Sequence, residues 1–508
     1  MSSTGKLIFR GASLNVIKMI VGILAGFFMM PFLINNLGNH LYGLWVSIGS
    51  IAGAYYLLDM GFSQAVTRYV AKCIHQKDYA GANKIINTSL AIYSALAAVI
   101  VLIAFFIAGF VAGNFVENPQ DIKLVQILII ITGVALAFEF PSKAFPGILN
   151  AYMRYDTTAI VAICKTVVDV ALVVVLLKNG FSLIAMVSVY FFTSIASTIF
   201  YIYYCNNLFK QIEYSRTNVN MATAKEMFHF SKWVFLMDAS QLLKDKMDIW
   251  LIAFYGSASL VTIYYVAVRL LDFGLQLLIQ MMGVTSTLFT KYYALGDTKK
   301  LTWIVTSCVK INFVLALVLF NGLYLVGYDF ISLWMGEAFE VDVAFTCLMI
   351  LSLGKLMGFV ARPFNGLLLT IKKHKYSANL SFIETIASGI LCVLLIPSMG
   401  LTGAAIAIAA PLVITKTFAL PLYAQQFIPT LSPLLLVRAA VAMCLAASVT
   451  LLFKVYILHD LKLGVINLIL VSVAYACIIP VLGLVMSNQE DRSLVNTYVR
   501  QFFKKLKH

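Results

Sequence analysis

The chain has 508 residues, of which 61% are hydrophobic and only 12% are charged. Soluble proteins carry about 25% charged residues, so this composition and a mean hydropathy of +0.91 exclude a soluble globular protein. The formal net charge of +15 does not indicate a nucleic-acid partner, because basic residues also gather in the cytoplasmic loops of membrane proteins.

Apolar runs of about 20 residues, the length that crosses a bilayer as a helix, recur along the whole chain. The short alternating segments of a membrane β-barrel do not occur. The sequence therefore predicts an all-α polytopic membrane protein with about 14 transmembrane helices. The predicted spans are residues 13–36, 42–66, 84–112, 122–145, 157–177, 181–205, 228–255, 258–287, 302–327, 343–364, 378–397, 401–423, 434–457 and 463–487.

Lysine and arginine residues are distributed unevenly between the gaps that separate these spans. When the residues near the ends of the spans are counted with the adjacent gap, the inner side holds 23 of them and the outer side only 4. Basic residues concentrate on the cytoplasmic side of membrane proteins, so both termini are expected to be cytoplasmic. The first apolar run is too long for a cleavable signal peptide. The 8 cysteines form no close pair that would indicate a disulfide framework or a zinc site.

Two parts of the sequence resemble each other weakly, with a period near 220 residues. LINNLGNHLYGLWVS (33–47) corresponds to LIAFYGSASLVTIYY (251–265), and Gly38 and Gly256 differ by 218 positions. Transporters often contain such repeats, with the substrate bound between them near the middle of the membrane. The pattern predicts two pseudo-repeated six-helix bundles around a central cavity, plus two C-terminal helices.

These considerations give predicted boundaries for four parts of the chain. They are an N-terminal six-helix bundle (1–215), a C-terminal six-helix bundle (216–430), two additional transmembrane helices (431–487) and a basic cytoplasmic tail (488–508).

Residues 229–256, HFSKWVFLMDASQLLKDKMDIWLIAFYG, contain six charged side chains in a predicted span. An ionisable group at the bilayer centre costs roughly 2.5–3.5 kcal/mol, so several are tolerated only where they face protein or water. This segment therefore predicts a polar pathway through the membrane. Hydropathy alone also allows a shifted pair of spans, 249–268 and 273–290, which would leave the charges at the cytoplasmic surface. The repeat favours the first register, because it equates Gly256 with the turn at Gly38.

Polar residues recur on single helical faces of the predicted spans. On the seventh span they follow the spacing i, i+3, i+7, i+10, and on the eighth span i, i+3, i+7. Small and polar residues also follow one track on the first span. The residues expected to line the translocation cavity are Lys18, Asp59, Arg68, Asp238, Gln241, Lys244, Asp245, Asp248, Arg269, Asp272 and Gln276.

A structural alternative remains open, in which charged pairs only hold helices together. Lys165 and Asp169 are complete as an i, i+4 pair and are expected to do this. Lys355 and Lys416 are lone cations that either reach the membrane surface or lie in the second bundle. Two single carboxylates are candidate ion-coupling groups, although such positions are usually structural: Glu139 and Glu384.

The segment LGNHLYGLWVSIGSIAGAYYLLDMGFSQAVTRYVAK (37–72) resembles the N-terminal signature of the polysaccharide, or O-antigen, flippases. The resemblance lies in the Leu-Gly turn, in Tyr-Gly-Leu-Trp, and in Asp-Met-Gly-Phe-Ser-Gln followed by Thr-Arg-Tyr. YGSASLVTIYYVAVRLLDF (255–273) is similar to the counterpart in the second half. These flippases belong to a superfamily that also contains the multidrug and toxin extrusion (MATE) transporters and the lipid II flippases.

The resemblance implies two six-helix bundles packed as a V, with the first, second, seventh and eighth spans around the cavity. It also implies a flippase that translocates a polyprenyl-diphosphate-linked oligosaccharide (an O-antigen, capsule or exopolysaccharide repeat unit) from the cytoplasmic to the outer leaflet of the bacterial cytoplasmic (inner) membrane by alternating access. Lysine or arginine would replace the hydration of the diphosphate. Lys18 and Arg269 are the first choices for this role, followed by Lys244 and Arg68.

Enzymatic activity is not expected, because no G-x-x-x-x-G-K-[ST] nucleotide-binding loop is present. No cofactor or metal site is expected, and a proton or sodium gradient is a candidate energy source. The expected partners are the lipid-linked oligosaccharide and membrane lipids, with a glycan polymerase or chain-length machinery as a further candidate and no nucleic acid. The alternative function is an ion-coupled secondary exporter of small amphipathic or cationic drugs with the same fold.

Overall fold

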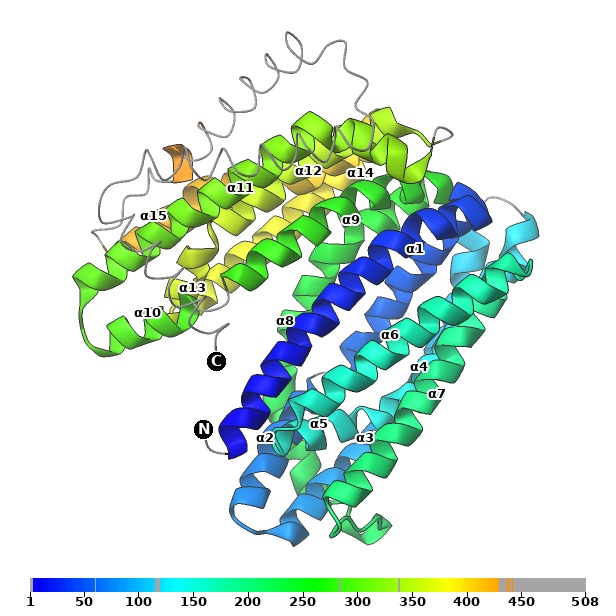
Figure 1. Ribbon diagram of the computed structural model, residues 1–508, viewed down its shortest axis with the longest axis vertical. Coiled ribbons are helices and arrows are strands. Elements are labelled where there is room, and N and C mark those ends of the chain that lie inside the picture. The colour runs from blue at the N-terminus through cyan, green and yellow to red at the C-terminus, as the bar shows by residue number, and fades with distance from the viewer. Residues whose placement is uncertain are drawn as a thin grey trace. The chain divides into compact units, whose positions relative to one another are not determined.

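A computed structural model describes residues 3–59, 61–114, 119–282, 285–336 and 339–428, together with 436–438 and 441. These residues form helices and short turns and contain no β-strand (Figure 1), which confirms the predicted all-α class. The thirteenth and fourteenth predicted spans and the basic tail lie essentially outside the described residues, so the count of fourteen spans stays a prediction.

The chain divides into two compact units, Met1–Thr262 and Ile263–His508. Gly38 has a φ of 77° and interrupts α1, which is thereby divided into two spans. Positive φ suits glycine because it has no Cβ. The helices of the first unit are α1 (Ser3–Tyr55), η1 (Tyr56–Asp59), α2 (Phe62–His75), α3 (Tyr79–Asn114), α4 (Pro119–Ser142), α5 (Ala144–Ala151), α6 (Tyr155–Lys178), α7 (Leu183–Leu208), η2 (Arg216–Asn218) and α8 (Met221–Tyr255).

In the second unit, Gly400 has a φ of 60° and interrupts α14 in the same way. A π-helical turn follows α14, so its side chains are rotated relative to a regular helix. The helices are α9 (Ala258–Met281, whose first turn belongs to the first unit), α10 (Thr285–Ala294), α11 (Thr298–Met335), α12 (Val341–Val360), α13 (Arg362–Thr370), α14 (His374–Ile414), η3 (Thr415–Ala419) and α15 (Leu420–Phe427).

Each of the first twelve predicted spans coincides with helix in the described residues. By length and composition, 9 stretches of these residues could cross a membrane. Two of them, Arg10–His75 and Lys375–Phe427, contain the interruptions at Gly38 and Gly400. The charged helix α8 is absent from the 9 because its ionisable residues are too closely spaced.

Backbone conformations support the repeat independently of hydropathy. Residues with left-handed φ recur at the same place in the two units, although non-glycine residues rarely adopt this conformation. The pairs are 219 or 220 positions apart: Lys77 (58°) with Gly296 (70°), Met153 (59°) with Lys372 (59°), and Gly180 (80°) with Gly400 (60°). The predicted pseudo-repeat is therefore visible in the geometry of its turns.

The packing of α8 does not follow the boundary that the repeat gave. The contacts of α8 place it in the first unit, which ends at Thr262, whereas the repeat assigned it to residues 216–430. The predicted boundaries describe the sequence repeat, whereas the two units are defined by contacts between helices. The predicted boundaries therefore stay a prediction.

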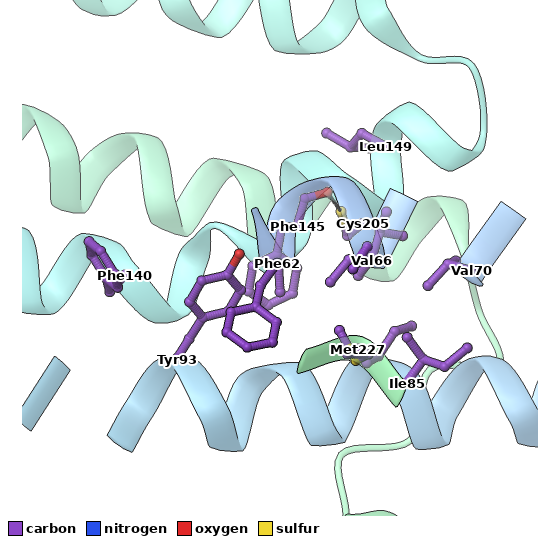
Figure 2. Close-up of a cluster of buried hydrophobic side chains, with 14 of the residues drawn as sticks. Phe62, Val66, Val70, Ile85, Tyr93, Phe140, Phe145, Leu149, Cys205 and Met227 are labelled. Carbon is purple, nitrogen blue, oxygen red and sulfur yellow. Dashed lines mark hydrogen bonds between the residues drawn. The ribbon is translucent and has the colours of Figure 1, made fainter. Parts of the chain in front are cut away.

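The core of the first unit is formed by apolar faces of short and long helices together. Phe62, Val66 and Val70 follow helical spacing on α2 and are fully buried, whereas Arg68 on the opposite face is exposed. They pack with α3, α4, α5 and α7 in a single hydrophobic cluster (Figure 2). Gly147 of α5 permits this packing, because an added Cβ would lie 3.0 Å from Val66. This core holds the short helices α2 and α5 against the long helices of the first unit.

Candidate translocation site

The structure places the predicted cavity residues on five helices. In the first unit they are Lys18 (α1), Asp59 (η1), Arg68 (α2), and Asp238, Gln241, Lys244, Asp245 and Asp248 (α8). In the second unit they are Arg269, Asp272 and Gln276, all on α9. A central cavity between the two bundles stays a prediction.

The helix break between α8 and α9 decides between the two registers left open by hydropathy. α8 ends at Tyr255 and α9 begins at Ala258, so the break falls at Gly256 as the repeat predicted. All the charges of residues 229–256 are therefore on one continuous helix. The shifted register, with a span across 249–268, is wrong.

Three of the four polar residues predicted to share a face of α8 are exposed, and the fourth is not. Asp238, Gln241 and Asp245 are exposed, and the Gln241 side-chain amide donates a 2.8 Å hydrogen bond to Asp245. Asp248 is buried, with 7% exposure, and accepts a 2.8 Å bond from the backbone N–H of Ile249. Asp248 is buried because α8 packs against α1 near this level.

A polar cluster occupies the first unit and consists of Asp59, Tyr93, Glu139, Lys143 and Tyr56. The fully buried Tyr93 donates a 2.6 Å hydrogen bond to Asp59. The Tyr56 hydroxyl lies 3.3 Å from Glu139, and the Lys143 ammonium lies 4.0 Å from the centre of the Tyr56 ring. Both carboxylates interact electrostatically with Lys143. The cluster joins four helical segments through charge and aromatic contacts.

Two members of this cluster were not singled out from the sequence. Tyr93 gives no polar signal in an apolar span, and Lys143 was counted as an inner-loop cation. The repeat offers a signal for Lys143, because Arg362 lies 219 positions further and both residues stand at the break within a span. Asp238 also interacts electrostatically with Asp59.

Replacing Tyr93 by phenylalanine should measure the strength of this cluster. The change keeps the ring but removes the donor to Asp59, and a hydrogen bond to a charged group contributes about 1.5–3 kcal/mol. We expect a clear decrease in the thermal unfolding temperature of the purified protein. Tyr56→Phe is the matched control and should have a smaller effect. The Tyr56 hydroxyl makes a longer hydrogen bond, 3.3 Å to Glu139, and the Tyr56 side chain is half-exposed. Equal unfolding temperatures for the two variants would contradict the proposed importance of the Tyr93–Asp59 contact.

In the second unit, the polar residues of α9 have partners of different kinds. Arg269 lies 2.6 Å from the Tyr265 hydroxyl, one helical turn away. Asp272 accepts a 2.8 Å bond from the Lys355 ammonium on α12, and both groups are partly exposed. Lys355, which the sequence left open, therefore belongs with the polar residues of α9. Gln276 is exposed.

Two other charged pairs are structural in character. Lys165 and Asp169 form the predicted i, i+4 ion pair at 2.9 Å, and Thr193 donates to the same carboxylate. In the second unit, Lys416 and Glu384 form an ion pair at 2.5 Å, with side-chain exposures of 7% and 1%. The interpretation of Lys416 as a lone cation is therefore wrong, since the turn η3 directs it to a carboxylate on α14.

Lys18 and Arg68 are two exposed cations of the first unit. Lys18 is exposed on α1, and the described part of the chain provides no hydrogen-bond or ion-pair partner for it. Arg68 is exposed on α2, with its guanidinium 6.0 Å from the Tyr69 ring centre. Both cations could therefore contact an anion that enters the first unit's surface.

A buried carboxylate connects the beginning of α1 with α6. Asp156 is 1% exposed and accepts bonds of 2.9 Å and 3.3 Å from Arg154, and the Arg10 guanidinium lies 3.6 Å away. The hydrogen bond to Asp156 raises the pKa of Arg154 above its usual value, so this turn keeps its positive charge at any physiological pH.

The described residues contain no group of three or more His, Cys, Asp or Glu side chains that could hold a metal ion.

Comparison with known proteins places the chain in a family. The sequence profile of the polysaccharide biosynthesis protein family matches residues 38–344, which is more than half of the chain. A candidate O-antigen transporter of Shigella flexneri is 21% identical over 388 residues, which cover 74% of this chain and 88% of that protein.

Solved structures of similar fold are transporters. The lipid II flippase MurJ, in an inward closed conformation, has a TM-score of 0.73 at 15% identity, covering 96% of this chain and 99% of MurJ. An inward-facing multidrug resistance transporter of the MATE family and MOP superfamily has a TM-score of 0.66 at 15% identity, covering 83% of this chain and 98% of that chain. At these identities the likeness shows the fold alone. The chain is therefore a multi-pass membrane transporter that belongs to the polysaccharide biosynthesis protein family and has the fold of the MOP superfamily flippases and exporters.

Proposed function

We propose that this protein flips a polyprenyl-diphosphate-linked oligosaccharide, such as an O-antigen, capsule or exopolysaccharide repeat unit, from the cytoplasmic to the outer leaflet of the bacterial cytoplasmic membrane. The family supports a role in polysaccharide biosynthesis. The relatives named as an O-antigen transporter and a lipid II flippase support a lipid-linked cargo. Alternating access is the mechanism that the fold favours, and both termini are proposed to be cytoplasmic.

The single observation that carries this proposal is the cation on α1, Lys18, which has no ion-pair partner among the residues that the structure describes. Lys18 is exposed among apolar neighbours such as Ile17 and Ile20, which are 47% and 43% exposed. A cation in hydrocarbon costs roughly 2.5–3.5 kcal/mol, so a position of this kind favours a cargo that brings its own negative charge. A diphosphate does so, and it cannot cross an apolar layer without neutralisation.

The second unit supplies a chemically different cation. Arg269 has a planar guanidinium that can bind a phosphate through two parallel bonds, and its contact with Tyr265 orients it. We propose that Lys18 and Arg269 bind the diphosphate, while Asp238, Gln241 and Gln276 bind sugar hydroxyls. The first-unit polar cluster, with its two carboxylates and one ammonium, is the proposed place where a proton or a sodium ion would couple to transport.

Purified protein in vesicles that contain a fluorescent polyprenyl-diphosphate sugar tests this proposal. A membrane-impermeant reductant quenches only the outer leaflet, so a flippase increases the fraction of label that is quenched. We expect protein-dependent quenching for the diphosphate-linked sugar, and much weaker quenching for the same lipid with an uncharged head group. The absence of any protein-dependent change would reject the flippase function.

A parallel experiment with a cationic dye tests the alternative drug-export function. Dye accumulation by the same vesicles, without flipping of the diphosphate lipid, would replace our proposal by that alternative. Partners such as a glycan polymerase or chain-length machinery would be sought only after flipping is established.

A further inference from the structure

The connection between α7 and α8, residues 209–220 and called the strap here, lies along α3 and is held by two asparagines. The Asn83 side-chain amide donates to Gln211 O at 2.7 Å and accepts from Glu213 N at 3.2 Å. Asn87 repeats this arrangement one turn later, donating to Glu213 O at 2.7 Å and accepting from Ser215 N at 2.9 Å. Each side chain thus bonds the strap as a neighbouring β-strand would.

The end of the strap is fixed to the same helix. The Thr88 hydroxyl accepts a 3.0 Å bond from the backbone N–H of Asn220, and Asn220 in turn caps the first turn of α8 through Ala222 N and Thr223 N. Asn83 and Asn87 are each 6% exposed and Thr88 is 1% exposed. An unpaired polar group at such a buried position is costly, so release of the strap would leave several of them without partners.

The body of α8 is also packed within the first unit. Figure 2 shows Met227 of α8 in the hydrophobic cluster with Val66 of α2 and Ile85 of α3, and Met227 is only 1% exposed. Near the other end of α8, the Trp250 indole N–H donates a 2.8 Å bond to the Ser50 hydroxyl of α1. α8 is therefore attached to the first unit at both ends.

The attachment continues into the first turn of α9. The buried Thr262 hydroxyl donates a 2.6 Å bond to Asn39 O. Gly43 of α1 lies so close to Ala258 that a Cβ at this position would overlap with the Ala258 carbonyl. The last residue attached in this way, Thr262, is also the last residue of the first unit.

We propose that the strap stays docked on α3 throughout transport, and that Asn83 and Asn87 are positioning residues that keep α8 in the first unit. A 12-residue connection between two repeats is the place where a hinge would otherwise be expected. The polar residues of α8 consequently move together with Lys18 and Asp59. This inference rests on the proposed flippase function and defines which helices act as one body.

A reversible cross-link between the strap and α3 tests this inference. Asn87→Cys and Ser215→Cys are introduced together, after the 8 native cysteines have been replaced by serine or alanine, and the folded protein is oxidised after reconstitution. Flipping of the fluorescent diphosphate lipid is then measured in the same vesicles before and after reduction. We expect the oxidised protein to flip lipid within about twofold of the parent, since the bond only fixes a contact that is already permanent.

The opposite result would overturn the inference. If oxidation decreases flipping by about tenfold or more and reduction restores it, the strap must leave α3 during the cycle. If the parent protein flips no lipid at all, the proposed function fails, and the docking of the strap is then judged by hydrogen exchange alone.

Hydrogen–deuterium exchange supplies that second measurement and needs no cysteines. We expect the backbone amides of residues 211–215 to be protected in the wild-type protein, with and without the lipid substrate. In Asn83→Leu and Asn87→Leu they should exchange at least about tenfold faster, which is the effect of losing about 1.4 kcal/mol. Asn179→Leu is the matched control, because its amide bonds only Val175 O on its own helix. Wild-type strap amides that exchange as fast as those of the leucine variants would contradict permanent docking.

Discussion

Replacing Arg269 by alanine is expected to abolish flipping while leaving membrane insertion and folding intact. Of the two residues that we propose to bind the diphosphate, Lys18 and Arg269, the arginine has the planar guanidinium that can form two parallel bonds to a phosphate. Each charge-assisted bond contributes about 1.5–3 kcal/mol. A loss of this size corresponds to a decrease of about 100-fold or more in flipping rate. The measurement is the quenching assay with the fluorescent polyprenyl-diphosphate sugar.

Two controls separate a binding role from a structural one. Arg269→Lys keeps the charge but loses the planar fork, so intermediate activity is expected. Tyr265→Phe removes the hydroxyl that lies 2.6 Å from the guanidinium, and it should lower activity less than Arg269→Ala. Normal turnover in the alanine variant would remove Arg269 from the site.

Replacing Glu384 by alanine is expected to destabilise the protein by about 3–5 kcal/mol, the usual effect of leaving a buried charge without its partner. Glu384 and Lys416 have side-chain exposures of 1% and 7%, and Thr415 also bonds Glu384. The variant would remove the carboxylate that pairs with the buried Lys416 ammonium. Thermal unfolding of the detergent-purified protein measures the effect.

The double variant Glu384→Leu, Lys416→Met is the decisive companion. It removes both charges, so most of the lost stability should return, because replacing a whole buried pair by apolar residues is often neutral. Asp272→Asn is the matched control for a partly exposed pair. The Lys355 and Asp272 side chains are 25% and 31% exposed, so this variant should change stability by only about 0–1 kcal/mol. A double variant as unstable as Glu384→Ala would contradict the explanation by unpaired charge.

The positions of the helices could be predicted from the sequence because the bilayer imposes a length on apolar segments. The break at Gly256 is the clearest example. Hydropathy allowed two registers, and the correspondence of Gly256 with Gly38 selected the one that the structure shows. Periodicity also identified Lys165 and Asp169 as a pair, because both lie on one helix and need no tertiary information.

Contacts between distant helices could not be predicted in this way. Tyr93 and Asp59 are 34 positions apart, and nothing in an apolar span marks one tyrosine as the partner of a carboxylate. The ion pair of Lys416 with Glu384 joins separate parts of the chain, and the π-helical turn at Thr415–Ala419 sets the direction of the Lys416 side chain. Asp248 lies on the predicted polar face, yet packing against α1 buries it.

The strap illustrates a further limit of sequence interpretation. Residues 209–220 lie between two predicted spans, and the repeat period near 220 residues predicts a bundle boundary at 215 within them. Asn83 and Asn87 are spaced i, i+4 on α3, but only the fold shows that their amides bond this loop. A repeat in sequence therefore does not define which helices pack together.

The claim on which the account depends most directly is that α8 crosses the bilayer with its charges along a polar pathway. Cysteine labelling with a membrane-impermeant maleimide in intact cells tests it, using Ser257→Cys at the α8–α9 break and Thr217→Cys in the strap. We predict that Ser257→Cys reacts from outside, whereas Thr217→Cys reacts only after the membrane is opened. Labelling of Thr217→Cys from outside, or protection of Ser257→Cys within the membrane together with free cytoplasmic reaction at Lys244→Cys, would contradict a membrane-spanning α8 and the site built on it.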